Sequence, residues 1–126
     1  MPFTRITTNF ILEDESSFID EFHNRMMSVL KIPEHDRQVV LDQKTKGFYQ
    51  PTNSSGKYVI FEIKMFSGRT LDTKKKLYKE LFDLANSVGV EGSNVNVILE
   101  DIEKQNWGIR GGQAASEVDL GFKTNV

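Results

Sequence analysis

The chain has 126 residues, of which 38% are hydrophobic and 27% charged, values typical of a soluble globular protein of single-domain length. The formal net charge of −2 gives no general attraction to nucleic acid or to anionic membranes, so neither is expected as a partner. The absence of cysteine excludes disulfides, thiol catalysis and cysteine metal sites. The two histidines, His23 and His35, lack the spacing of a helical zinc-binding pair, so no metal is expected.

Targeting and membrane signals are absent from the pattern of the sequence. The N-terminal segment has no apolar core of a signal peptide, and no apolar run approaches the length of a membrane span. The run TKKKLYKE (73–80) mixes lysines with acidic neighbours around a helix, which favours a solvated face over a nucleic-acid patch. We therefore expect a single cytoplasmic domain over residues 1–126.

The first half of the chain predicts a strand, a helix and a second strand. Residues 2–8 form a short stretch rich in β-branched side chains, which favours a strand. Between positions 13 and 30, apolar residues recur on one face of a helix at Phe18, Phe22, Met26 and Val29. A second strand is predicted at 38–43, and the polar segment 44–57, which contains two glycines and a proline, predicts a loop.

The second half repeats this order of elements. Residues 58–66 alternate as a strand, and residues 94–101 form another. Between them, 67–88 predicts a helix with Thr70 as its N-cap. The core face of this helix is expected at Leu77, Leu81, Leu84 and Val88. The remaining residues, 102–126, form a glycine-rich tail to which no element is assigned.

Two consecutive βαβ units, about 2–43 and 58–101, predict an α+β fold of the α/β-sandwich type. Its four-stranded sheet carries both helices on one face, with parallel strands inside each unit. The strand at 58–66 places Ile60 on the face opposite Phe61 and Ile63, and the strand at 94–101 places Ile98 on the face opposite its valines and Leu99, so both faces of the sheet carry apolar groups. Because two helices cover only one face, we expect the bare face to bind other copies of the chain.

Four separated segments together resemble the tautomerase superfamily, whose members use an amino-terminal proline. They are Pro2 at the start of the first strand, PEHDRQ (33–38), FSGRT (66–70) and NWGIRGG (106–112). The branch they resemble most is that of malonate semialdehyde decarboxylase and its relatives. The resemblance implies a cofactor-free enzyme that assembles as a homotrimer, with its active sites between subunits.

The resemblance implies that Pro2 carries the catalytic proton once Met1 has been removed. The small side chain at position 2 favours that removal. A secondary amine is normally protonated at neutral pH, but an apolar pocket and a nearby arginine are expected to lower its pKa. The neutral amine could then accept a proton from the substrate.

Four further residues receive roles from the same resemblance. Arg69, at a helix start, is expected to hold a substrate carboxylate through its guanidinium fork, and Asp36 to orient water and polarise the substrate. Trp107 and Ile109 are expected to form the apolar wall of the substrate site. Ser67 stands where the branch commonly has a second arginine, and Ile109 where relatives often have an aromatic residue. With Ser67 in place of the second arginine, we expect Arg69 alone to hold the substrate carboxylate. With Ile109 in place of an aromatic residue, we expect the pocket to differ in shape from that of the relatives.

Structural alternatives exist for each of these residues. Asp36 could pair with Arg37 or cap a turn, and Arg69 could be a solvated arginine paired with Asp72. Trp107 could fill a core or an interface, because an indole serves packing as well as a pocket wall.

The predicted function is the interconversion of keto and enol forms of a small 2-oxo acid such as phenylpyruvate, with neutral Pro2 as the general base. One alternative is decarboxylation of malonate semialdehyde, or hydration of an unsaturated acid, with protonated Pro2 and with Asp36 orienting water. A third is a non-catalytic trimeric binding or signalling protein, since the superfamily includes macrophage migration inhibitory factor.

Overall fold

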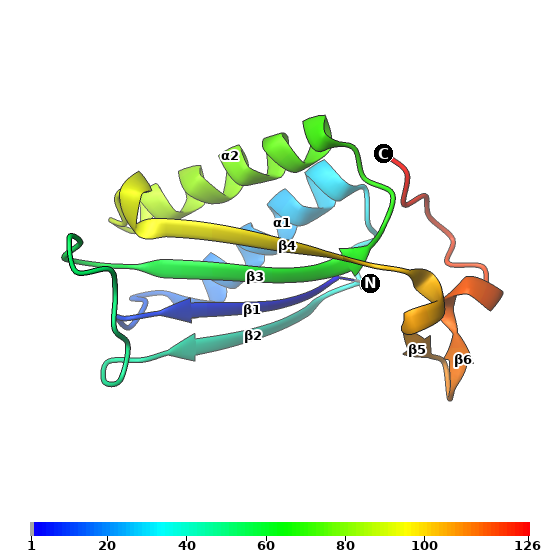
Figure 1. Cartoon of the computed structure of the whole chain (residues 1–126), viewed down its shortest axis with the longest axis horizontal. Coiled ribbons are helices and arrows are strands. Elements are labelled where there is room, and N and C mark those ends of the chain that lie inside the picture. The colour runs from blue at the N-terminus through cyan, green and yellow to red at the C-terminus, as the bar shows by residue number, and fades with distance from the viewer. Residues whose placement is uncertain (1) are drawn as a thin grey trace.

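A four-stranded sheet with two long helices on one of its faces makes up most of the computed structural model, which describes residues 2–126 (Figure 1). The first unit consists of β1 (Phe3–Thr8), α1 (Glu15–Leu30) and β2 (Gln38–Gln43). The second consists of β3 (Val59–Phe66), α2 (Leu71–Ser87) and β4 (Val95–Ile102). The predicted α+β fold of two βαβ units is confirmed, and the strand boundaries lie within one residue of those expected from the sequence.

The strand order β2-β1-β3-β4 joins the two units through their first strands. Strand β1 is parallel to β2, and β3 is parallel to β4, as expected for βαβ units. The central pair β1 and β3 is antiparallel, with Phe3 opposite Lys64 and Thr8 opposite Val59. This register sets the start of β1 beside the end of β3, so Pro2 lies near the turn that leads from β3 into α2.

Helix α1 is delimited by local chemistry at both ends. The side chain of Asp14 accepts a hydrogen bond from the Ser17 amide, which caps the first turn. The helix ends at Lys31, whose left-handed backbone (φ 57°) lets its amide bond to the Met27 carbonyl. The buried face consists of Phe18, Phe22, His23, Met26 and Leu30.

Helix α2 begins later than the sequence pattern suggested. Thr70 is its N-cap and accepts from the Thr73 amide, as predicted, and the first helical residue is Leu71. The residues before it form a turn, because Gly68 has φ of +129°, a conformation that is incompatible with a right-handed helix. The buried face is made of Leu77, Leu81, Leu84 and Ala85.

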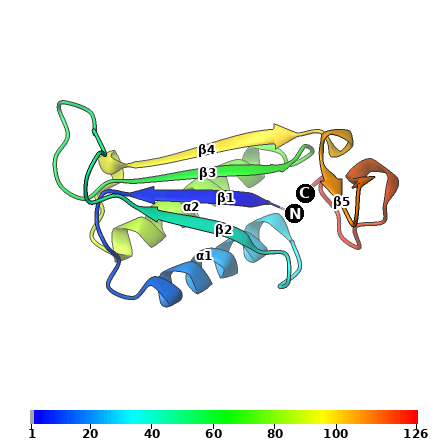
Figure 2. The ribbon, with the colours of Figure 1, turned by 90° about the horizontal axis from the view of Figure 1, so that it is seen from below.

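The main core fills the space between the helices and the sheet. Ile6, Phe61 and Ile63 are buried on the helix side of the strands, and the rings of Phe22 and Phe61 stack with their centroids 5.7 Å apart. Figure 2 shows the opposite face of the sheet, which neither helix covers. That face carries the exposed Val40 and Ile98 among charged side chains such as the pair Lys64–Glu100, 3.8 Å apart.

The tail folds into a small unit beyond the end of β4, which the sequence pattern did not indicate. It contains a hairpin of β5 (Gly108–Ile109) and β6 (Gln113–Ala114). A second apolar cluster forms here around Phe66, Ile109 and Ala115. The chain then returns to α2, where the Val126 oxygen accepts hydrogen bonds from the Thr70 amide and the Thr73 hydroxyl. The described ends of the chain therefore lie at the same end of the sheet (Figure 2).

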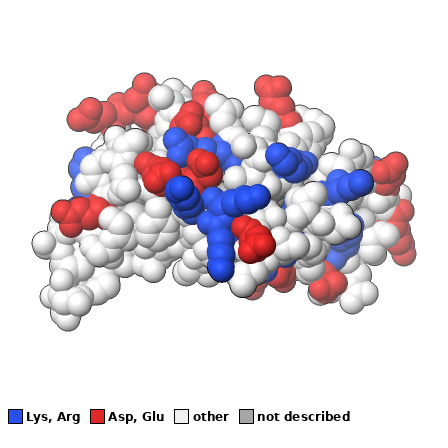
Figure 3. Space-filling view, turned by 90° about the horizontal axis from the view of Figure 1, so that it is seen from above, with Lys and Arg blue, Asp and Glu red and all other residues white. Residues whose placement is uncertain are grey.

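Charged side chains of both signs mingle on the helix-covered face of the molecule (Figure 3). Lys74 on α2, from the lysine run, pairs with Asp101 on β4 at 2.7 Å. Neither helix within residues 2–126 has the length and apolar character required to cross a bilayer.

Candidate active site

Pro2 and Asp36 line one narrow crevice between the start of β1, α1 and the loop before β2. Both are buried, and 8% of Asp36 is exposed. The parallel pairing of β1 with β2 brings them together, because Phe3 lies opposite Gln38 in the register. The other residues that line the crevice are Thr4, Phe22, His23, Met26, Arg37, Gln38 and Val39.

The loop that carries Asp36 is fixed from two directions. Its own amide donates to the Pro33 carbonyl across a turn (3.1 Å). The ring of His23, from α1, lies with Nε2 2.6 Å from the Glu34 carbonyl oxygen, so Nε2 carries the proton that it donates there. The neighbouring Arg37 directs its guanidinium to the Asp20 carboxylate at 3.0 Å. Asp36 is thus held at the crevice by a main-chain turn and by a histidine from the adjacent helix.

Arg69 lies in the turn between β3 and α2 and is 7% exposed, so it is not the solvated arginine of the alternative interpretation. Its Nη2 donates to the Leu30 carbonyl at 3.1 Å and its Nη1 to the Phe66 carbonyl at 3.4 Å. Burial lowers the pKa of the guanidinium, and the negative charges of Asp101 and Asp36 oppose that shift. The interaction with Asp36 places Arg69 within electrostatic reach of the Pro2 crevice.

The backbone around Arg69 is packed against the tail. A Cβ added to Gly68 would lie 2.8 Å from the Thr124 carbonyl oxygen, so glycine is needed for this close approach. Next to it, the Thr70 amide is already bonded to the Val126 oxygen. An anion at this position would therefore meet the Arg69 guanidinium rather than the Thr70 amide.

Trp107 and Ile109 do not line the Pro2 crevice in this chain. Ile109 is 8% exposed and belongs to the second apolar cluster. Trp107 packs edge-on against Phe66, with ring centroids 4.9 Å apart, and lines a separate groove of about 290 Å³ that also contains Phe3 and Gln38. Because Gln38 lines both hollows, Trp107 lies close to the crevice, whereas Ile109 lines neither hollow.

Thr4 and His23 belong to this site but were not singled out from the sequence. The alternation of β1 could have placed Thr4, because residues two apart on a strand share a face. Within residues 2–126, the Thr4 hydroxyl and the Arg69 Nε are the two buried side-chain polar atoms that have no hydrogen-bond partner. The same residues contain no group of three or more His, Cys, Asp or Glu side chains that could hold a metal ion.

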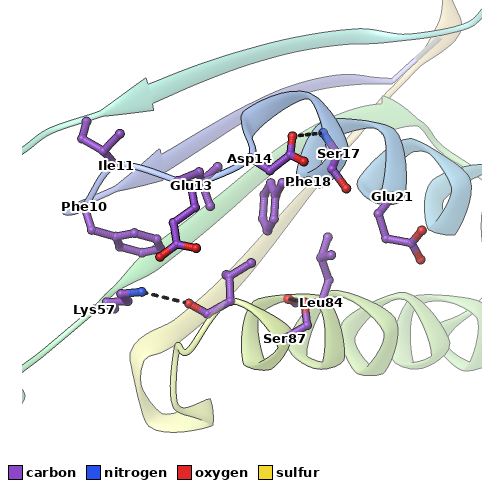
Figure 4. Close-up of a pocket in the computed structure, with 12 residues that line it drawn as sticks. Phe10, Ile11, Glu13, Asp14, Ser17, Phe18, Glu21, Lys57, Leu84 and Ser87 are labelled. Atoms are coloured by element: carbon purple, nitrogen blue, oxygen red, sulfur yellow. Dashed lines mark hydrogen bonds between the residues drawn. The ribbon is translucent and has the colours of Figure 1, made fainter.

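A larger hollow of about 370 Å³ lies at the other end of β1 (Figure 4). Three of its charged side chains, Asp14, Glu21 and Lys57, are engaged in contacts of the fold. Lys57 donates to the Val88 carbonyl at 3.1 Å and lies over the Phe10 ring, and Asp14 caps α1 through the Ser17 amide. None of the residues predicted for the active site lines this hollow.

Comparison with known proteins gives one family match and several relatives. The sequence model of a family described as "Tautomerase enzyme" matches residues 24–110. A 2-hydroxymuconate tautomerase from Comamonas testosteroni is 37% identical over 51 residues, which are 40% of this chain and 81% of the relative.

Solved structures share the fold at low sequence identity. FG41 malonate semialdehyde decarboxylase, inhibited by 3-bromopropiolate, superposes with a TM-score of 0.72 at 22% identity and covers 89% of this chain and 92% of its own. A fused 4-OT, a symmetric trimer, superposes with a TM-score of 0.82 at 13% identity and covers 92% of this chain and 99% of its own.

Proposed function

Because the chain belongs to the tautomerase family, a family of enzymes, we propose that it interconverts the keto and enol forms of a small 2-oxo acid with Pro2 as the general base. The observation that carries this proposal is the buried position of Pro2 in one crevice with Asp36, within electrostatic reach of Arg69. No cofactor takes part in the proposed reaction.

The surroundings of Pro2 suit a proton carrier. Phe22 and Met26 present apolar surface to the crevice, which disfavours the charged form of an amine. In the proposed step Pro2 takes the proton from the carbon next to the carbonyl, and the electrons of that C–H bond form the C=C bond of the enol. The protonated Pro2 then returns the proton to the carbonyl oxygen, so the base is regenerated. This chemistry requires that Met1, which lies outside the described residues, has been removed.

Arg69 is the proposed partner of the substrate carboxylate. A guanidinium has five N–H donors, and the carbonyls of Leu30 and Phe66 occupy two of them. The buried Nε has no partner, so we propose that the edge of the guanidinium that carries Nε donates to the substrate carboxylate. A charge-assisted contact of this kind is stronger than one between neutral groups.

Keto–enol conversion of phenylpyruvate, followed by ultraviolet absorbance, tests the proposal on protein whose free Pro2 is verified by mass spectrometry. We expect Pro2→Ala to lower kcat/KM by about 10²–10⁴-fold, the contribution of a positioned general base. Pro51→Ala, in the exposed loop, is the matched control and should leave kcat/KM unchanged. Wild-type protein no faster than buffer, or Pro2→Ala as active as wild type, would refute the proposed function.

A second candidate is the decarboxylation of malonate semialdehyde, or hydration of an unsaturated acid, with protonated Pro2. The observation that favours it is the carboxylate of Asp36 in the same crevice, since a nearby negative charge stabilises an ammonium. In this reaction Asp36 would orient the water. A ¹⁵N NMR titration of Pro2 separates the two candidates, because a resting neutral amine supports the tautomerase and a resting ammonium supports the decarboxylase or hydratase.

We further propose that the chain works as a homotrimer. The fused 4-OT of similar fold is a symmetric trimer, and the uncovered sheet face exposes 40% of Val40 and 55% of Ile98. Light scattering should give three times the 14.4 kDa chain mass, and a monomer at working concentration would contradict this proposal.

A further inference from the structure

Among the residues that line the Pro2 crevice, Thr4 has the buried side-chain polar atom that no hydrogen bond satisfies. Thr4 is 1% exposed, and its Oγ1 makes no hydrogen bond within the described chain. A buried hydroxyl without a partner costs free energy that an apolar side chain of the same shape would not cost. The position therefore calls for a partner that is not a protein group of this chain.

Thr8 on the same strand shows that a buried threonine can be satisfied here. It faces the helices like Thr4, is 0% exposed, and donates its hydroxyl to the Phe10 carbonyl at 2.6 Å. The surroundings of Thr4 differ, because Phe22 and Met26 are apolar and the His23 Nε2 is committed to Glu34. The two threonines can therefore be compared directly, because the Thr8 hydroxyl makes a hydrogen bond within the chain and the Thr4 hydroxyl does not.

The crevice has the size and the polar groups that a single water molecule needs. About 10 Å³ of it is open to the centre of a water molecule, which is about enough for one. Pro2 and Thr4 share the helix-facing side of β1, since residues two apart point the same way. The titratable and charged groups around them are Asp36 and Arg37 from the loop, His23 from α1, and Arg69 through its charge.

We propose that Thr4 is a positioning residue whose hydroxyl holds one water molecule between the Pro2 nitrogen and the Asp36 carboxylate. While Pro2 is protonated, its proton passes to this water and a proton of the water passes to Asp36, which exchanges it with solvent. The reverse transfer returns a solvent-derived proton to Pro2 for delivery to the substrate, so Pro2, the water and Asp36 are all regenerated. A hydroxyl both donates and accepts, so it keeps the water in place before and after the transfer. This inference rests on the proposed function in one respect, that Pro2 carries the proton.

Proton exchange with solvent provides a readout that a purely structural threonine would not move. The rate at which phenylpyruvate ketonises is measured alongside the rate at which its keto form exchanges C3 hydrogen for deuterium in D₂O. Thr4→Val keeps the shape but removes the hydroxyl, and we expect it to lower the ratio of exchange to ketonisation by about tenfold, with little change in KM. Thr4→Ser, which retains the hydroxyl, should restore the ratio.

Thr8→Val is the matched control. It loses the bond to Phe10 and should lower Tm without changing the exchange ratio. If Thr4→Val raises Tm and leaves the ratio unchanged, its hydroxyl is merely unsatisfied and the inference is wrong.

A wild-type protein that neither ketonises nor exchanges phenylpyruvate counts against the proposed function rather than against Thr4. The ¹⁵N titration of Pro2 then decides the inference by itself. A midpoint that moves by at least half a pH unit in Thr4→Val, and returns in Thr4→Ser, supports the water contact. A midpoint identical in all three proteins overturns it.

Discussion

The two ends of the sheet differ in whether their buried side-chain polar atoms have hydrogen-bond partners. At the loop end, Asn94 accepts from the Ser54 hydroxyl at 2.7 Å and donates to the Ser55 and Lys57 carbonyls at 2.7 and 3.0 Å. At the Pro2 end, the Thr4 hydroxyl and the Arg69 Nε are buried without a partner. Because hydrogen bonds made within the fold add to its stability, the bonds of Asn94 at the loop end contribute to folding, whereas two polar atoms at the Pro2 end make no such contribution.

Judged by volume alone, the hollow near Lys57 would be preferred over the Pro2 crevice as a ligand site. The hollow near Lys57 offers about 370 Å³ and the Pro2 crevice about 10 Å³. In the larger hollow, Lys57 donates to the Val88 carbonyl and Asp14 accepts from the Ser17 amide, and none of its side chains has a buried polar atom without a partner. Buried polar atoms without a partner therefore distinguish the Pro2 end, whereas volume does not, and under the proposed function changes at the two ends should separate activity from stability.

Of the two substitutions that test the buried polar groups of this comparison, Arg69→Lys is expected to have the larger effect. The substitution keeps the positive charge but loses the planar fork, so one ammonium would have to replace contacts to two carbonyls and a carboxylate. A charge-assisted hydrogen bond contributes about 1.5–3 kcal/mol, so we expect kcat/KM to fall by about 10–100-fold, mostly through KM. Steady-state kinetics with phenylpyruvate measures this.

Arg110→Lys, at an exposed position of the tail, is the control for the same chemical change and should leave kcat/KM unchanged. Arg69 also joins the ends of α1 and β3 through Leu30 and Phe66. An Arg69→Lys protein that loses stability but keeps full kcat/KM would show that Arg69 serves only to link α1 and β3 through these two hydrogen bonds.

Local sequence patterns were sufficient for the two helices and the four strands of the main sheet, but not for the order of those strands or for the tail. The helical spacing of Phe18, Phe22 and Met26 and the N-cap Thr70 each depend on neighbours a few residues away, and the structure confirms them. The antiparallel pairing of β1 with β3 joins segments about fifty residues apart, and no short pattern specifies it. The hairpin of β5 and β6 has only two residues in each strand, too few for an alternation to be recognised.

In the candidate site too, the sequence indicated individual residues but not the contacts that they make with distant elements. The resemblance named Pro2, Asp36 and Arg69, and the register of β1 and β2 explains why the first two meet. The sequence could not reveal that the Arg69 donors are shared with main-chain carbonyls, because those partners come from distant elements. The alternation of β1 could have identified Thr4, but its missing partner is visible only once α1 is packed against the strand.

The smaller effect is expected from Asn94→Ala, at the loop end of the sheet. Asn94 is 5% exposed and takes part in three hydrogen bonds. At about 1 kcal/mol for each neutral bond, the free energy of unfolding should fall by about 2–3 kcal/mol, as measured by urea denaturation with an unchanged m value. Asn96→Ala is the matched control, because the Asn96 side chain is exposed and bonds only to the Tyr58 hydroxyl, so the substitution should lower the free energy of unfolding by about 1 kcal/mol or less.

Under native conditions kcat/KM of both variants should equal that of wild type, since the Pro2 crevice contains neither residue. A loss of activity in Asn94→Ala without a loss of stability would mean that the two ends of the sheet are coupled.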